Sequence, residues 1–146
     1  MMASAPPAAD LAAPSLQDVG LAVKRLQWRH HRTANERLAE LGVSLVQWDV
    51  LRHLSQQPDA SLHALAELTF QTDQSMGTLA ARMIQRGLIE RVAGPGRAVR
   101  HRLTPRGRDV HEAGAAIVDG VLAETIGKLN AGERADLHRL LLHAAR

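Results

Sequence analysis

The residues with the clearest chemical use lie between positions 72 and 108, where small polar side chains are followed by arginines. Gln74, Ser75 and Thr78 share one face of an expected helix that Thr72 begins. Their amide and hydroxyl groups can hydrogen-bond to base edges in a DNA major groove. Eight of the chain's 18 basic residues follow with Glu90 as the single acid: Arg82, Arg86, Arg91, Arg97, Arg100, Arg102, Arg106 and Arg108. Binding of phosphate groups requires positive charge of this kind.

Three of these arginines lie on an expected hairpin. Arg97 follows a Gly-Pro-Gly turn, where we expect it to reach the minor groove or a phosphate. Arg100 and Arg102 alternate with apolar residues, so they share the polar face of a strand. The sequence therefore predicts a DNA-binding set of seven residues: Thr72, Gln74, Ser75, Thr78, Arg97, Arg100 and Arg102.

A second group of residues suits a small ligand. Two indoles could stack on a ring, and a cation or a histidine could meet a carboxylate or phenolate. The candidate ligand-binding residues are Trp28, His31, Arg32, Trp48 and Arg52. The alternative is a solvated helix face with a polar position in a dimer seam. Metal binding by His30, His31 and His111 is disfavoured, because adjacent histidines on a helix point about 100° apart.

Composition favours packed helices and gives no sign of catalysis. The 146 residues are 45% hydrophobic but only 2% aromatic, they contain no cysteine, and their net charge is +3. Nucleotide-binding glycine loops, H-E-x-x-H and G-x-S-x-G are all absent from the sequence, so we predict a protein that is not an enzyme and needs no metal or cofactor. No apolar run of membrane-spanning length or secretory signal occurs, which favours a cytoplasmic protein without membrane contact.

Helix and turn signals predict the elements that position these groups. Apolar periodicity and caps indicate a long helix over 15–41 and a second helix that Ser44 begins. A short helix, a turn, the helix from Thr72 and a hairpin come next, which is the order of a winged helix-turn-helix. The later elements are expected at 61–68, 72–86, 88–92, 98–103, 104 to about 128, and 130 to about 145. The predicted fold is mainly α, with a small two- or three-stranded β wing and a helical dimerisation lobe.

Four segments resemble the MarR family of winged helix-turn-helix regulators. They are LAELGVSLVQWDVL at 38–51, LAEL at 65–68, MIQRGLIER at 83–91 and RHRLTPRG at 100–107. Their order and spacing match over roughly residues 20–145. The resemblance implies six helices and a wing, a homodimer formed by the first and last two helices, and a pseudo-palindromic operator in double-stranded DNA. It also implies, for many members, a small anionic or phenolic ligand in a cleft between two lobes.

The sequence departs from the family pattern in two places. Members usually have Asp-x-Arg at the wing tip, where this chain has Pro95-Gly96-Arg97, so the carboxylate that would orient Arg97 is missing. Members also often have an arginine near the middle of the recognition helix, where this chain has Thr78. We therefore expect specificity to depend on the helix more than on the wing.

These inferences predict a division of the chain. Residues 1–14 are rich in Ala and Pro and are expected to form a disordered arm, 15–43 and 104–146 a dimerisation lobe, and 44–103 the DNA-binding lobe. The predicted function is a homodimeric, sequence-specific transcription repressor relieved by a phenolic or carboxylate ligand. Two alternatives stay open: a constitutive DNA-binding protein without an effector, and a metal or pH sensor that uses its histidines.

Overall fold

The computed structural model describes residues 13–93, 96 and 99–146. Its main elements are α1 (Leu16–Leu38), α2 (Leu45–Gln56), α3 (Leu62–Leu68), α4 (Asp73–Gln85), β1 (Ile89–Val92), β2 (Arg100–Leu103), α5 (Pro105–Ala123) and α6 (Ala131–Ala144). Two short 3-10 helices, η1 (Ala39–Leu41) and η2 (Ile126–Lys128), follow α1 and α5. This order confirms the predicted fold class of a helical protein with a winged helix-turn-helix. The expected disordered arm lies almost wholly outside the described residues.

Side chains at the helix starts fix the element bounds. At α1, α2 and α6 the capping side chain accepts the backbone N–H of the third helical residue, whose own side chain accepts the N–H of the cap. Thr104 caps α5, with Pro105 at the first helical position. The caps of all six α-helices were predicted: Ser15, Ser44, Ser61, Thr72, Thr104 and Asn130.

The expected end of α5 near Lys128 was wrong, because the helix stops at Ala123. Thr125 leaves helical geometry with φ −119° and ψ −82°, and its backbone N–H bonds to the Leu122 carbonyl in a tighter turn. Two contacts with α1 hold the chain there: Thr125 Oγ1 hydrogen-bonds to His30, and Glu124 pairs with Arg37 at 2.8 Å. These long-range partners decide the helix end, and local periodicity contains no signal for them.

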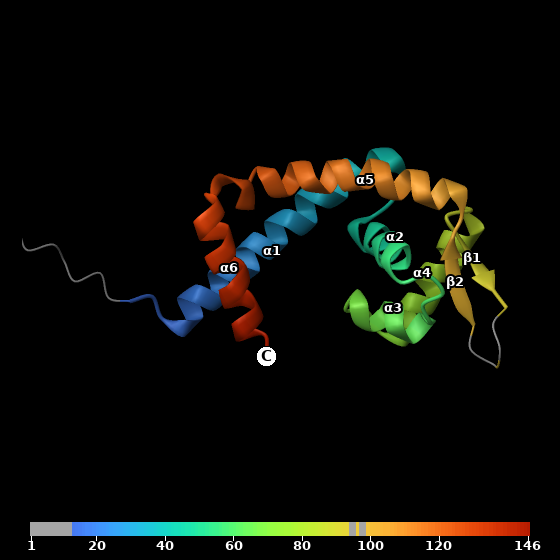
Figure 1. Cartoon of the computed structure of the whole chain (residues 1–146), viewed down its shortest axis with the longest axis horizontal. Coiled ribbons are helices and arrows are strands. Elements are labelled where there is room, and N and C mark those ends of the chain that lie inside the picture. Colours follow the sequence, from blue (N-terminus) through green and yellow to red (C-terminus); the bar gives the residue numbers. More distant parts are fainter. Residues whose placement is uncertain (1–12, 94–95, 97–98) are drawn as a thin grey trace, which may run out of the picture.

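Figure 1 shows that the long helices α1 and α5 connect the two ends of the molecule. α6 lies near the N-terminal part of α1 at one end, and α3, α4 and the two strands lie at the other. α5 runs along the top, packing against both α1 and α2. The helix-turn-helix and wing therefore lie at the end opposite α6, whereas α5, which was also expected to contribute to a dimer, begins next to the wing.

The hydrophobic core sits beneath the helix-turn-helix and the wing. Its fully buried side chains are Leu38, Val50, Leu51, Leu65, Met76, Met83, Leu88 and Ile89. β1 and β2 pair antiparallel, with Ile89 opposite Leu103 and Val92 opposite Arg100. An isolated bridge between Ser61 and Arg100 ties the start of α3 to this two-stranded sheet, which packs on the core as a wing.

Candidate nucleic-acid interface and ligand cavities

One face of α4 is polar and open to solvent. Gln74, Ser75 and Thr78 are exposed, whereas Met76, Ala80 and Met83 on the other face are buried. The polar residues line a shallow hollow together with Leu79 and Arg82. Thr72 caps the helix, with its hydroxyl accepting the Ser75 N–H at 3.0 Å, so its role is to set where the helix begins. The structure therefore groups the four helix residues that were predicted to bind DNA.

An ionic cluster joins α3 to the start of α4. His63 lies between two acids, with Nδ1 2.9 Å from Asp73 and Nε2 3.0 Å from Glu67. The hydrogen bond that His63 donates to the Asp73 carboxylate raises the pKa of His63, and the charges of Asp73 and Glu67 raise it further. The cationic form of His63 is thereby favoured, and it ties the two helices of the helix-turn-helix together.

The wing arginines have partners within the protein. Arg100 donates to the Asp59 carbonyl at 3.0 Å, and Arg102 pairs with the Asp59 carboxylate at 3.3 Å. Asp59 lies in the loop between α2 and α3, so this loop holds both guanidinium groups in place. Each guanidinium retains free N–H donors, since a guanidinium has about five. Arg97, the third predicted wing contact, lies outside the described residues.

A cavity of about 410 Å³ lies between α1, α2 and α5. We call it the interlobe cavity. Its lining residues are His30, Ala34, Leu45, Trp48, Asp49, Arg52, Val118, Asp119, Val121 and Leu122. Burial raises the pKa of Asp49, opposed by the charges of His53 and Arg52. Burial also lowers the pKa of His30, with a smaller contribution from Arg29. The cavity therefore combines an indole, a cation and acids at a boundary between helices.

Trp48 has the most contacts that fix its side chain among the predicted ligand residues. It is only 6% exposed, its Nε1–H donates to the His111 carbonyl at 3.1 Å, and its ring stacks on that of His111. Trp48 and Arg52 both line the interlobe cavity. These two members of the predicted ligand set are thus brought together on α2.

The other three predicted ligand residues lie elsewhere on α1. Trp28 is 59% exposed and stacks on His31, and Arg32 pairs with Glu36 one turn later. None of the three is among the described residues that line the interlobe cavity. The structure therefore divides the predicted ligand set: Trp48 and Arg52 line the interlobe cavity, Trp28 and Arg32 are exposed, and His31 is half-buried on α1.

An apolar groove runs between α1 and α6. It has a volume of about 530 Å³, and its lining residues are Val19, Ala22, Val23, Leu26, Gln27, His30, His31, Leu45, Ile126, Leu137 and Leu141. Three further apolar side chains nearby are strongly exposed: Leu16, Leu140 and Leu142. No residue of α6 is buried within the described chain. An exposed apolar surface of this extent is typical of a protein–protein interface.

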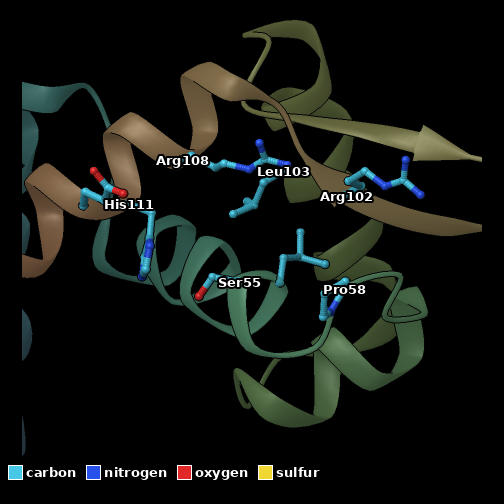
Figure 2. A pocket seen from close by; sticks show the side chains of 8 residues that line it. Ser55, Pro58, Arg102, Leu103, Arg108 and His111 are labelled. Atoms are coloured by element: carbon cyan, nitrogen blue, oxygen red, sulfur yellow. The ribbon is translucent and has the colours of Figure 1, made fainter.

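A further cavity, called here the wing-base cavity, was not predicted. It has a volume of about 510 Å³ and lies between the end of α2, strand β2 and the start of α5 (Figure 2). Its lining residues are Leu54, Ser55, Pro58, Arg102, Leu103, Arg108, His111 and Glu112. The one local signal was the basic charge of Arg106 and Arg108 in the first turn of a helix, where the helix dipole disfavours cations.

The described residues contain neither a cluster of metal-ligating side chains nor a helix that could span a membrane. Within residues 13–93, 96 and 99–146, no three histidine or acidic side chains are grouped so that they could hold a metal ion. Nor does any helix in the same part of the chain have the length and apolar character needed to cross a membrane.

Comparison with known proteins identifies the family. A model of the MarR family matches residues 41–98. The HTH-type transcriptional repressor Rv2887 of Mycobacterium tuberculosis is 32% identical over 106 residues, which cover 71% of this chain and 76% of that protein. The chain belongs to the MarR family. The resemblance expected from the four sequence segments is thus confirmed.

Solved MarR-family structures extend the similarity beyond the segment that the family model matches. Rv2887 in complex with p-aminosalicylic acid has a TM-score of 0.72 and 28% identity, and covers 92% of this chain and 100% of its own. The BpsR protein of Bordetella bronchiseptica, whose structure concerns regulation of its DNA binding by 6-hydroxynicotinic acid, has a TM-score of 0.78 at 25% identity. That match covers 88% of this chain and 98% of BpsR. The shared MarR fold therefore includes the long helices as well as the winged helix-turn-helix.

Proposed function

We propose that this protein is a homodimeric, sequence-specific DNA-binding repressor of transcription that a small ligand releases from its operator. The observation that carries the proposal is the exposed polar face of α4 in a winged helix-turn-helix. The opposite face of the same helix is apolar and buried. Membership of the MarR family and similarity to a repressor support it. α4 is the recognition helix in this proposal.

The base-reading groups are Gln74, Ser75 and Thr78. Gln can pair in a bidentate manner with adenine, whereas hydroxyl groups are less selective. Arg100 and Arg102 contact phosphates while Asp59 holds them, and Arg97 reaches the minor groove or a phosphate. Because phosphate contacts carry no direct sequence information, we expect specificity to come mainly from the three α4 residues.

The dimer forms through the dimerisation lobe, residues 15–43 and 104–146, and it presents two copies of the DNA-binding lobe, residues 44–103. The apolar groove between α1 and α6, and the exposed leucines of α6, support this interface. Two recognition helices related by a two-fold axis would enter successive major grooves about 34 Å apart. A pseudo-palindromic operator matches that symmetry.

The ligand of this proposal is a small phenolic or carboxylate compound in the interlobe cavity. Trp48 offers a ring surface there, and Arg52 offers a cation to an acid or phenolate. Relatives support this class of ligand, since Rv2887 has been solved with p-aminosalicylic acid and BpsR responds to 6-hydroxynicotinic acid. Ligand binding would favour a spacing of the two recognition helices that does not fit the operator, which requires a coupling of only about 1–3 kcal/mol.

The test of DNA reading compares two glutamine substitutions in one helix. Operators are first selected from random duplexes with the wild-type protein, and binding is then measured by fluorescence anisotropy at fixed salt. Gln74→Ala should weaken binding to the selected site by about 5- to 150-fold, as expected for the loss of a bidentate base contact worth about 1–3 kcal/mol. Binding to scrambled DNA should change little. Gln85→Ala, at the far end of α4, is the matched control. Equal losses on both DNAs would refute base reading by Gln74.

The ligand proposal is tested on the same complex. Salicylate and phenol are titrated into protein bound to the selected operator, and the anisotropy change is compared with that of an Arg52→Gln variant. Release by either compound that needs Arg52 supports the interlobe cavity. Insensitivity to both would favour a constitutive DNA-binding protein instead.

A further inference from the structure

The two cavities beside α2 differ in charge. The interlobe cavity has two carboxylates, Asp49 and Asp119, and one guanidinium group. The wing-base cavity reverses this balance, with two guanidinium groups, Arg102 and Arg108, and one carboxylate. An anion therefore gains more favourable electrostatic energy in the wing-base cavity than in the interlobe cavity.

Arg108 is the available cation of the wing-base cavity. Arg102 already pairs with Asp59, but Arg108 forms no ion pair with any residue in the described part of the chain. It lies in the first turn of α5, where the helix dipole makes a positive side chain unfavourable. An anion next to Arg108 would offset that cost and form charge-assisted hydrogen bonds.

The rest of the cavity suits the apolar part of an organic molecule. Leu54 and Leu103 are buried and form apolar walls together with Pro58. Figure 2 shows Arg108 and Leu103 close together on one side, with Ser55 on α2 and Pro58 in the turn after α2 across the opening. A volume of about 510 Å³ lies within the range of small-molecule sites, which is roughly 300–1,000 Å³.

We propose that the wing-base cavity is a second ligand site, distinct from the interlobe cavity, that binds a small organic carboxylate. The carboxylate lies against Arg108 with Arg102 beside it, and the apolar body lies between Leu54 and Leu103. The occupied site links three elements: the end of α2, the wing strand β2 and the start of α5. It therefore fixes the direction of the wing relative to the helical body.

The position of His111 connects the two cavities. His111 lines the wing-base cavity, and its ring stacks on Trp48, which lines the interlobe cavity, with ring centroids 5.9 Å apart. A carboxylate in one cavity therefore lies one stacked pair away from a ligand in the other. Binding at either site changes the surroundings of the same Trp48–His111 pair.

Equilibrium dialysis of radiolabelled benzoate against the full-length protein tests this proposal. Because the measurement contains no DNA, its outcome is independent of repressor activity. Two variants disable the site in different ways: Arg108→Gln removes the cation, and Ser55→Phe fills the cavity. Arg106→Gln, on the same helical turn but outside the lining, is the matched control. Circular dichroism verifies that each variant is folded. Two competitors separate the contributions to binding. Benzyl alcohol has the apolar ring without the negative charge, and inorganic phosphate has the negative charge without an apolar part.

The expected result is that Arg108→Gln and Ser55→Phe each lose one bound benzoate per chain, or bind it at least tenfold more weakly, while Arg106→Gln binds like the wild type. Neither competitor should displace benzoate at an equal concentration. The proposal is overturned if the wild type binds no benzoate, or if Arg108→Gln and Arg106→Gln bind it alike. Displacement by phosphate at equal strength would also overturn it, because the site would then select a simple anion and not an organic acid.

Discussion

Replacing Gly114 with alanine should destabilise the protein even though alanine is the better helix former. Gly114 lies on the face of α5 that packs on α2, and it is buried. A Cβ atom added there would press on Trp48 Cδ1, lie 2.6 Å from Nε1 and lie 3.3 Å from Leu38 Cδ2. The indole cannot turn aside freely, because it is buried and its Nε1–H donates to the His111 carbonyl.

The change in the free energy of unfolding is the sum of one stabilising and two destabilising effects. Alanine in the interior of a helix is favoured over glycine by about 1 kcal/mol. Overpacking of a well-packed core costs about 1–3 kcal/mol, and loss of the indole hydrogen bond costs about 1 kcal/mol more. Gly114→Ala should therefore lower the free energy of unfolding by about 1–3 kcal/mol. Gly120→Ala, in the same helix, places its Cβ where no atom of the described chain lies within 4 Å, so it should raise that free energy by up to about 1 kcal/mol.

Urea unfolding followed by far-ultraviolet circular dichroism measures both variants at one protein concentration, because the stability of the proposed dimer would depend on concentration. A Trp28→Phe background adds a local measurement, since the remaining fluorescence then comes from Trp48 alone. Opposite signs for the two alanine variants would support close packing of α5 on the Trp48 indole. If Gly114→Ala were as stable as Gly120→Ala, the packing argument would be refuted.

Three further predictions use backbone strain and titration. Phe70 is 95% exposed and has a φ of 58°, so Phe70→Gly should raise the free energy of unfolding by about 0.5–1 kcal/mol in urea unfolding, and a loss of stability would show an unrecognised contact. Burial, with help from Arg91, holds the pKa of His101 below 6.5, so the unfolded chain binds a proton that the folded protein excludes. Stability should therefore fall as the pH drops through about 6.5, and His101→Gln should flatten that slope when urea midpoints are compared across pH. The pKa of His63, measured by NMR, should lie above 6.5 and should decrease in Asp73→Asn, and a pKa unaffected by that change would exclude the ionic cluster in solution.

Local chemistry was enough to predict most of the fold. Ser44 with Gln47, and Thr104 with Pro105, specify helix starts through atoms a few residues apart, so sequence spacing reveals them. The polar face of α4 was predictable for the same reason. The end of α5 was not, because Glu124 meets Arg37 across 87 positions. The wing-base cavity was missed on similar grounds, since its walls come from elements that only the folded chain brings together.

The contacts of α2 limit how a ligand could act on DNA binding. α4 packs mainly on α3 and β1, whereas α2 contacts α1, α3, β2 and α5. A ligand in the interlobe cavity touches α1, α2 and α5, and α2 is the one of these three that contacts α3, so its effect can reach the helix-turn-helix directly through α2. The close fit of Trp48 against Gly114 prevents α2 from moving toward α5, and a ligand that needs more room must therefore push α2 away. Gly114→Ala pushes in the same direction, so it should weaken operator binding without any ligand, and Gly120→Ala should not.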